Sequence, residues 1–330
     1  MTINGGQTMR RVSLALLIGI TALTGPDGAQ AQNWPTKTIK VVVPLTAGSA
    51  TDVMARIVFD QVSQQVGQSI VIENRPGAGN SIGMNAVAKA EPDGYTILAN
   101  SSTHTVSPAV RETMPLDTVN DLSAIIPLGN MPVVIVFSPK KGYKQLSDFV
   151  AWAKANPGKA NYSSAGAGNS SHLNGELFRL AAGFEAVHLP FKGAPEAMTE
   201  VIAERSDYYF SPLVNALPLM KGGQLQALAV SNSTRASALP DIPTTVQAGY
   251  PNSEYNFWAG VFVPSKTPAA IKEKLQAEIA KALQTPGVRD KLKNLGADPM
   301  PLTPAQFDAQ VRKEIETNSK IAKAANIRVK

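Results

Sequence analysis

Two separate stretches of the chain each place an apolar strand before a loop rich in glycine and serine that opens a helix. The first runs from Lys40 to Asp52 and the second from Ala160 to Leu173. The first N–H groups of a helix have no intrahelical partner, and the helix dipole adds partial positive charge there. Each loop is therefore suited to bind an anion. Two such loops in different halves of one chain can hold an anionic ligand from both sides.

The residues that we expect to contact the ligand lie in these loops or just after neighbouring strands. From the first loop they are Ala47, Gly48, Ser49, Ala50, Thr51 and Asp52. From the second they are Ser164, Ala165, Gly166, Gly168, Asn169, Ser170 and Ser171. Beyond the loops they are Ser101, Ser102, Thr103, Lys192 and Ser211. Two alternatives stay open: Thr51 or Asp52 serves only as a helix cap, and Lys192 only faces solvent.

Other chemistry finds little support in the sequence. Gly166-Ala-Gly168 lacks the third glycine of a dinucleotide fingerprint. His172 and Glu176 have i, i+4 spacing, but one such pair makes no metal site, and a surface hydrogen bond is the simpler expectation. We predict no cofactor, no metal and no enzymatic activity. The alternative is a hydrolase that uses a cleft serine or histidine, for example Ser171 with His104.

Composition narrows the class of protein. The chain has 330 residues, of which 44% are hydrophobic, and this length favours two domains. The formal net charge is +6, but Lys and Arg are scattered and form no basic stripe with aromatic residues, so nucleic-acid binding is unsupported. Cysteine is absent, which excludes disulfides, thiol catalysis and thiolate metal sites. It also leaves no cysteine for a lipid anchor.

The first residues have the pattern of a signal peptide. Arg10-Arg11 precede an apolar run over 12–23, and Ala29-Gln-Ala31 fits a cleavage site. The run is shorter than the roughly 20 residues that span a bilayer. We predict that residues 1–31 are removed and that the mature protein is periplasmic.

Apolar runs and helical periodicities alternate along the rest of the chain. We expect strands at 39–44, 69–73, 95–100, 132–137, 161–165, 186–190, 207–210, 225–231 and 256–263. We expect helices at 52–65, 80–90, 147–155, 195–204, 268–283, 288–295 and 304–325, another that starts near 171, and a polar loop at 101–107. We also expect Arg75 to pair with Glu73, Trp258 to be buried and 138–141 to form a turn.

This order predicts an α/β protein in which each of two lobes has a doubly wound, mostly parallel sheet. We assign residues 32–131 and 256–330 to one lobe and 132–255 to the other. Two crossovers then join the lobes, which implies a cleft and a hinge. Ligands bind such sheets beyond the carboxyl ends of the strands, where the candidate loops lie.

The sequence resembles the Bug-type substrate-binding proteins of tripartite tricarboxylate transporters. The likeness covers nearly all of the mature chain, and the matching segments include 40–52, 73–79, 91–98, 162–172, 188–195, 240–244 and 258–260. Two segments depart from the family pattern. Leu45-Thr-Ala-Gly-Ser49 stands where the family has a loop richer in proline and glycine, and Arg205-Ser-Asp207 replaces Gly-x-Val-Asp.

The resemblance implies a type II periplasmic binding protein that closes on a small organic acid. The ligand would be a mono- or dicarboxylate or an aromatic acid, held by backbone amides, hydroxyls and water. The resemblance also implies membrane permease subunits of a tripartite transporter as partners, or a sensor kinase to which the ligand is presented. We expect the protein to be monomeric.

Overall fold

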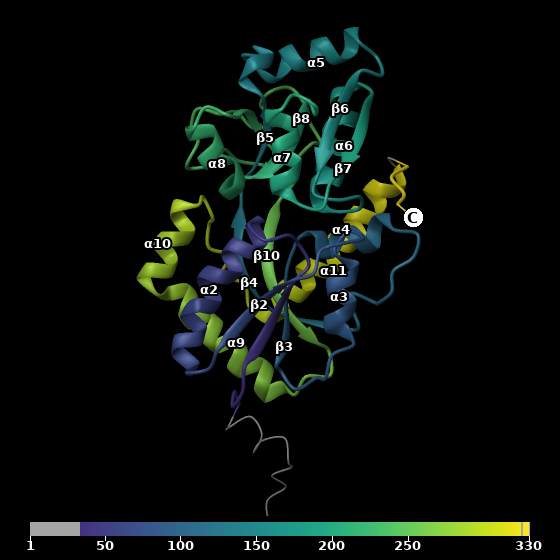
Figure 1. The fold of residues 1–330 in the computed structure, drawn as a ribbon. Helices are drawn as coiled ribbons and strands as arrows, with labels where there is room; N and C mark the ends of the chain where they lie inside the picture. The colour runs from purple at the N-terminus through teal and green to yellow at the C-terminus, as the bar shows by residue number, and fades with distance from the viewer. Residues whose placement is uncertain (1–33, 325, 330) are drawn as a thin grey trace, which may run out of the picture.

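The computed structural model describes residues 34–324 and 326–329. The predicted signal peptide lies outside these residues. Figure 1 shows two α/β lobes stacked on one another, and the C-terminal helix returns to the lobe in which the described chain begins.

The first sheet has the strand order β2-β1-β3-β10-β4. Its strands are β1 (Ile39–Val43), β2 (Ile70–Asn74), β3 (Thr96–Ser101), β4 (Leu122–Met131) and β10 (Phe257–Pro264). β1 is parallel to β2 and β3, whereas β10 is antiparallel to both β3 and β4. Four strands therefore point the same way, with their carboxyl ends at one edge.

The second sheet repeats this arrangement in the order β7-β6-β8-β5-β9. Its strands are β5 (Val133–Phe137), β6 (Ala160–Ser164), β7 (Ala186–Pro190), β8 (Tyr208–Pro212) and β9 (Gln226–Val230). Here β5 is the strand that runs opposite to its neighbours. The chain passes between the lobes from β4 to β5 and from β9 to β10.

Helices cover both sheets. The first lobe has α2 (Ala50–Val66), α3 (Ser81–Ala88), α4 (Thr103–Val110), α9 (Ala269–Gln284), α10 (Pro286–Asn294) and α11 (Pro304–Ala324). The second has α5 (Leu146–Ala155), α6 (Ser170–Ala182), α7 (Ala194–Ile202) and α8 (Leu213–Lys221), and a 3₁₀ turn at Pro139–Lys141 where we predicted a turn. This confirms the two-lobed α/β fold.

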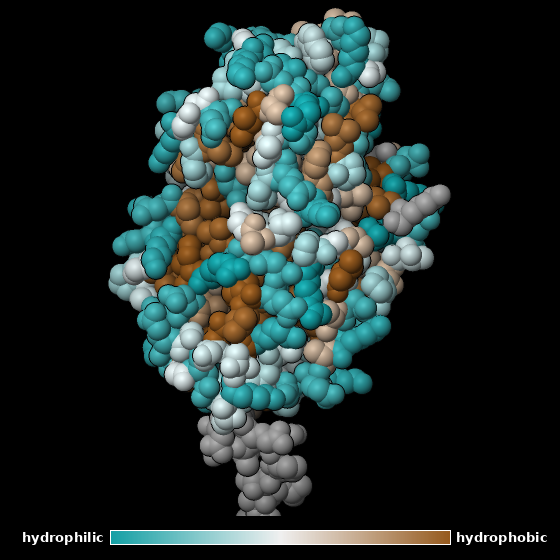
Figure 2. Space-filling view, viewed as in Figure 1, coloured by the Kyte–Doolittle hydropathy of each residue, from teal (hydrophilic) through white to brown (hydrophobic). Residues whose placement is uncertain are grey.

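Apolar side chains pack the helices against the sheets. Met54, Val58 and Val62 recur along one face of α2 and are buried against the first sheet. Trp258 is buried as predicted, and its indole N–H donates to Glu314 on α11. Arg75 forms the predicted ion pair with Glu73. Figure 2 shows hydrophobic surface gathered in a hollow between α10 and α2, near the level where the lobes meet.

Three elements differ from the sequence prediction. The segment predicted as a polar loop at 101–107 forms most of α4, and β4 and α8 were not predicted. In α4 the polar side chains are buried and hydrogen-bonded inside the protein, as when the Thr105 hydroxyl donates to the Ser102 carbonyl at 2.8 Å. Polar composition was thus misleading, because these hydroxyls are bonded inside the protein instead of to water.

Candidate ligand-binding site

A cavity lies between the lobes, at the ends of the strands. Nine predicted residues line it: Ser49, Ala50, Thr51, Ser101, Thr103, Ala165, Asn169, Ser170 and Ser171. Ten lining residues were not predicted: Leu45, Val133, Asn174, Ala194, Tyr209, Phe210, Pro212, Asn215, Tyr255 and Phe257. None of the lining side chains carries a formal charge. The cavity is therefore polar without being ionic.

The first lobe contributes the N-terminus of α2. Ser49 is the N-cap, and its hydroxyl accepts the Asp52 N–H. The N–H groups of Ala50 and Thr51 bond to no other described residue, and both residues line the cavity. The loop before α2 is bonded to the first turn of that helix, because the Gly48 N–H donates to the Asp52 carboxylate at 2.9 Å.

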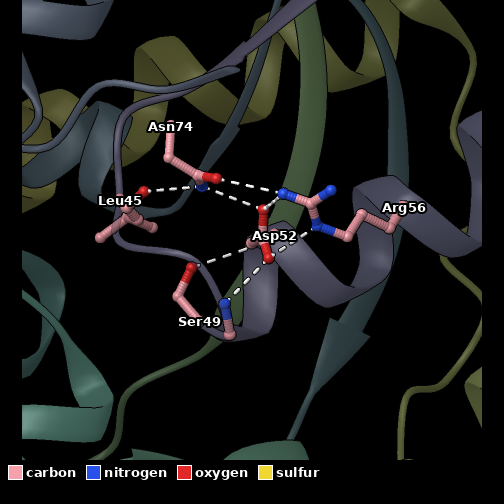
Figure 3. A network of polar contacts seen from close by, with 6 residues as sticks. Leu45, Ser49, Asp52, Arg56 and Asn74 are labelled. Atoms are coloured by element: carbon pink, nitrogen blue, oxygen red, sulfur yellow. Dashed lines mark hydrogen bonds and ion pairs between the residues drawn. The ribbon is translucent and has the colours of Figure 1, made fainter. Parts of the chain in front are cut away.

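Asp52 belongs to a structural network (Figure 3). Its carboxylate is buried, contacts the Arg56 guanidinium at 2.9 Å and accepts from the Asn74 amide at 2.9 Å. Asn74 also donates to the Leu45 carbonyl. Burial raises the pKa of Asp52, but hydrogen bonds from Arg56, Gly48 and Asn74 outweigh burial, and the net shift is downward. Asp52 thus orders the loop from outside the cavity.

The second lobe contributes the N-terminus of α6. Asn169 is the N-cap, and its side-chain oxygen accepts the His172 N–H and the Ser171 hydroxyl. Several amides of this loop are already bonded: Ala165 N–H to Ser171, Gly166 N–H to Ser164, and Gly168 N–H to His172. The Ser171 N–H has no partner among the described residues. The helix N-terminus, more than the glycines, offers an unpartnered N–H group that suits an anion.

The N-termini of α2 and α6 thus meet one cavity from opposite lobes. Between them, Thr103 and Ser170 join the lobes by a hydroxyl–hydroxyl hydrogen bond of 3.2 Å. Asn215 of α8 donates to the Gly48 carbonyl at 2.7 Å. The cavity has a volume of about 30 Å³, which leaves room for only a few water molecules. A ligand of several heavy atoms therefore needs more space between the lobes than this arrangement leaves.

The remaining predicted residues do not line the cavity. They are Ala47, Gly48, Asp52, Ser102, Ser164, Gly166, Gly168, Lys192 and Ser211. Lys192 is exposed, and the buried Ser211 hydroxyl donates to the Pro212 carbonyl. Ser102 accepts from the hydroxyl of Tyr255, a lining residue, at 2.8 Å. Ser102 therefore contacts the lining from outside the cavity. The apolar residues and tyrosines that line the cavity could not be predicted, because nothing in the sequence distinguishes them from residues of the hydrophobic core.

His104 on α4 and His172 on α6 are buried, and His188 on β7 is partly buried. His172 and His188 stack with ring centroids 3.9 Å apart, and His188 Nε2 lies 2.6 Å from the Ser164 hydroxyl. The predicted surface hydrogen bond between His172 and Glu176 is wrong, since His172 is buried and accepts from Gly168, while Glu176 pairs with Arg179. Burial lowers the pKa of His172 to about 4 and that of His188 to about 3.

The Ser171–His104 pair that we named for a hydrolase does not form. The Ser171 hydroxyl donates to Asn169 and accepts from Ala165, whereas His104 contacts the Thr118 carbonyl and stacks on Phe262. Within residues 34–324 and 326–329 there is no cluster of side chains suited to a metal ion. No helix in that part of the chain is long and apolar enough to cross a membrane.

A larger hollow of about 820 Å³ lies over β4, α9 and α10. Charged side chains of both signs line it, among them Arg289, Asp290 and Lys293. It contains the start of α10 at Pro286, where proline has no N–H to offer. The features that suit an anion are therefore concentrated in the cavity between the lobes.

Comparison with known proteins agrees with this geometry. The chain matches the tripartite tricarboxylate transporter family receptor over residues 54–327. BugT of Bordetella pertussis is 31% identical over 326 residues, covering 98% of this chain and 100% of BugT. MatC of Rhodopseudomonas palustris, solved with bound malate, has a TM-score of 0.84 and 31% identity over 87% of this chain and 99% of MatC. Another R. palustris protein, solved with adipate, has a TM-score of 0.86 and 30% identity over 89% of this chain and 99% of that protein.

Fold and cavity together define a two-lobed periplasmic binding protein of type II. The chain belongs to the tripartite tricarboxylate transporter receptor family, whose members include the Bug proteins.

Proposed function

We propose that this protein captures a small organic carboxylate between its lobes. The observation that carries the proposal is the meeting of two helix N-termini, those of α2 and α6, in one interlobe cavity. Unpartnered N–H groups and the aligned helix dipoles stabilise negative charge there. The apolar lining residues, such as Leu45, Phe210 and Phe257, suit the carbon skeleton of an organic acid. Malate and adipate in the two related structures are carboxylates of this kind.

Binding proceeds by closure of the lobes about the two connections between them. The hydrogen bonds from Thr103 to Ser170 and from Asn215 to Gly48 join the lobes and leave little room. Opening at the β4–β5 and β9–β10 connections admits the ligand, and closing brings the second helix N-terminus onto it. The ligand then stabilises the closed arrangement by its contacts with both lobes.

The closed protein delivers its ligand to the membrane subunits of a tripartite tricarboxylate-type transporter. Family membership supports this role, and so does the predicted signal peptide, which directs the chain to the periplasm. The protein acts by binding and not by catalysis. The cavity supports this view, because the hydroxyls of its serines bond to backbone amides, to the Asn169 oxygen and to Thr103, and not to a histidine base.

Isothermal titration calorimetry on the mature chain tests the proposal. The panel contains monocarboxylates, dicarboxylates and aromatic acids, each with its neutral amide as control. We expect at least one acid to bind with micromolar or tighter affinity and its amide to bind at least tenfold more weakly. Equal affinity for acid and amide, or no binding by any acid, would contradict the proposal.

A further inference from the structure

We infer that the bound carboxylate also carries a neutral hydrogen-bond donor, a hydroxyl or a carboxamide, which donates to the side-chain oxygens of Asn174 and Asn215. This inference rests on the proposed function and narrows its ligand class. Both residues line the interlobe cavity, Asn174 on α6 and Asn215 on α8. Neither was predicted from the sequence as a ligand-binding residue.

The two amide oxygens are buried and have no hydrogen-bond partner. Asn174 is 1% exposed. Asn215 is partly exposed, but its Oδ1 atom is buried. Buried polar groups are almost always hydrogen-bonded, so an unpartnered pair at the wall of one cavity indicates a partner that arrives with the ligand. The Thr51 hydroxyl, also unpartnered and buried, adds a third polar group on the first-lobe side of the cavity.

The orientation of the Asn215 amide is fixed by its partner. Its NH₂ group donates to the Gly48 carbonyl at 2.7 Å. A carbonyl oxygen only accepts, so the reverse orientation would set two acceptors against each other. The Asn215 oxygen is therefore the side-chain atom without a hydrogen-bond partner, and it can only accept a hydrogen bond.

The orientation of the Asn174 amide follows from a chain of hydrogen bonds. The Ser231 hydroxyl donates its single proton to the Tyr255 carbonyl. Ser231 must therefore accept from Asn174, whose NH₂ group lies 3.0 Å from the hydroxyl oxygen. The Asn174 oxygen is again the free acceptor. Two fixed acceptors from two helices of the second lobe thus require donors on the ligand.

The donor is neutral because the cavity offers an ammonium group no anionic partner. No Asp or Glu side chain lines the cavity. The ammonium of an amino acid would have only the ligand's own carboxylate beside it, and its hydration costs more to remove than that of a hydroxyl. A hydroxyl or carboxamide loses less on burial and matches a neutral acceptor. Hydroxy acids and carboxamide acids are therefore favoured over amino acids.

Calorimetric titration of the mature chain with matched trios tests this inference. One trio is succinate, malate and aspartate; the other is propionate, lactate and alanine. We expect the hydroxy acid to bind about tenfold or more tightly than its parent and more tightly than the amino acid. Hydroxy acids no tighter than their parents, or amino acids tighter than both, would overturn the inference while leaving carboxylate capture intact. No binding by any member, when another acid of the wider panel does bind, would overturn the inference alone; no binding by any acid of that panel would overturn the proposed function.

Variants assign the preference to the two asparagines. In Asn174→Leu and Asn215→Leu the ratio of hydroxy-acid to parent affinity should fall towards one. Asn85→Leu is the matched control, because the Asn85 oxygen is also buried and unpartnered but lies on α3, outside the cavity. Asn174→Asp keeps the shape of the side chain and supplies an anion, so it should shift the preference to the amino acid. An unchanged ratio in both folded leucine variants would contradict the assignment.

Discussion

Asp52 illustrates how residue type and spacing can indicate the right place and leave the role open. The sequence placed it among the residues that touch the ligand, with helix capping as the alternative. In the structure its carboxylate faces away from the cavity and bonds to Gly48, Arg56 and Asn74 (Figure 3). Sequence cannot separate these roles, because Arg56 comes from the next turn of α2 and Asn74 from the end of β2.

Asp52→Ala should therefore destabilise the fold and weaken ligand binding together. The change leaves the Gly48 N–H and the Asn74 amide without their carboxylate acceptor, which costs about 1–3 kcal/mol in the free energy of unfolding. The control is Asp308→Ala, which removes an exposed i, i+4 pair with Arg312 and should cost about 0.5 kcal/mol or less. Urea unfolding gives both values. Equal losses would show that the Asp52 network contributes no more than a surface pair.

Protonation of the buried histidines should make stability fall in mild acid. Burial lowers the pKa of His104 and of His172 from 6.5 to about 4. Between pH 6.5 and 4 the unfolded chain binds protons that the native protein does not, so stability is full above pH 6.5 and decreases as pH falls. Each histidine accounts for about 2 kcal/mol between pH 7.5 and 5. His172→Asn should remove its share of this pH dependence, and a slope equal to that of the wild type would contradict the assignment.

At the scale of elements, the strand–loop–helix units could be predicted from the sequence. The spacing of hydrophobic residues and the position of the capping residues indicate the same helix starts. Ser49 and Asn169 stand at the starts of α2 and α6, close to where the sequence placed them. The helix α4 was not predictable in the same way. Its polar residues are buried against α11 from the far end of the chain, and that contact cannot be read from a local window.

Asn169→Asp separates capping from ligand binding. Aspartate caps a helix as well as asparagine does, so the free energy of unfolding should change by less than about 1 kcal/mol. The new negative charge lies at the anion site, so carboxylate affinity should fall at least tenfold. Asn169→Ala should instead lose about 1 kcal/mol of stability. Retained carboxylate affinity in a stable Asn169→Asp protein would place the ligand elsewhere.

At the scale of the whole molecule, two lobes with two connections were predictable from the order of strands and helices. The contacts between the lobes were not. Gly193, before α7, and Thr46, in the first loop, lie in different lobes, yet a Cβ atom built on Gly193 would lie 1.8 Å from the Thr46 hydroxyl. Only the folded arrangement of both lobes makes this glycine necessary, because its extended backbone admits any residue.

Gly193→Ala should therefore hinder closure without unfolding either lobe. Ligand affinity should fall about tenfold or more, because closure is needed to complete the site, while urea unfolding changes little. Thr46→Gly in the same chain removes the clashing atoms and should restore affinity. Gly287→Ala is the control, since a Cβ atom there meets nothing within 4 Å. Failure of the double variant to recover would show that Gly193 acts by some means other than the contact with Thr46.

A crystal structure of the protein with its tightest-binding acid tests the central claim most directly. The account predicts that the carboxylate lies between the lobes, within hydrogen-bond distance of the Ala50 or Thr51 N–H on one side and the Ser171 N–H on the other. A carboxylate bound in the hollow over β4, α9 and α10, or one held only by side chains of a single lobe, would contradict it.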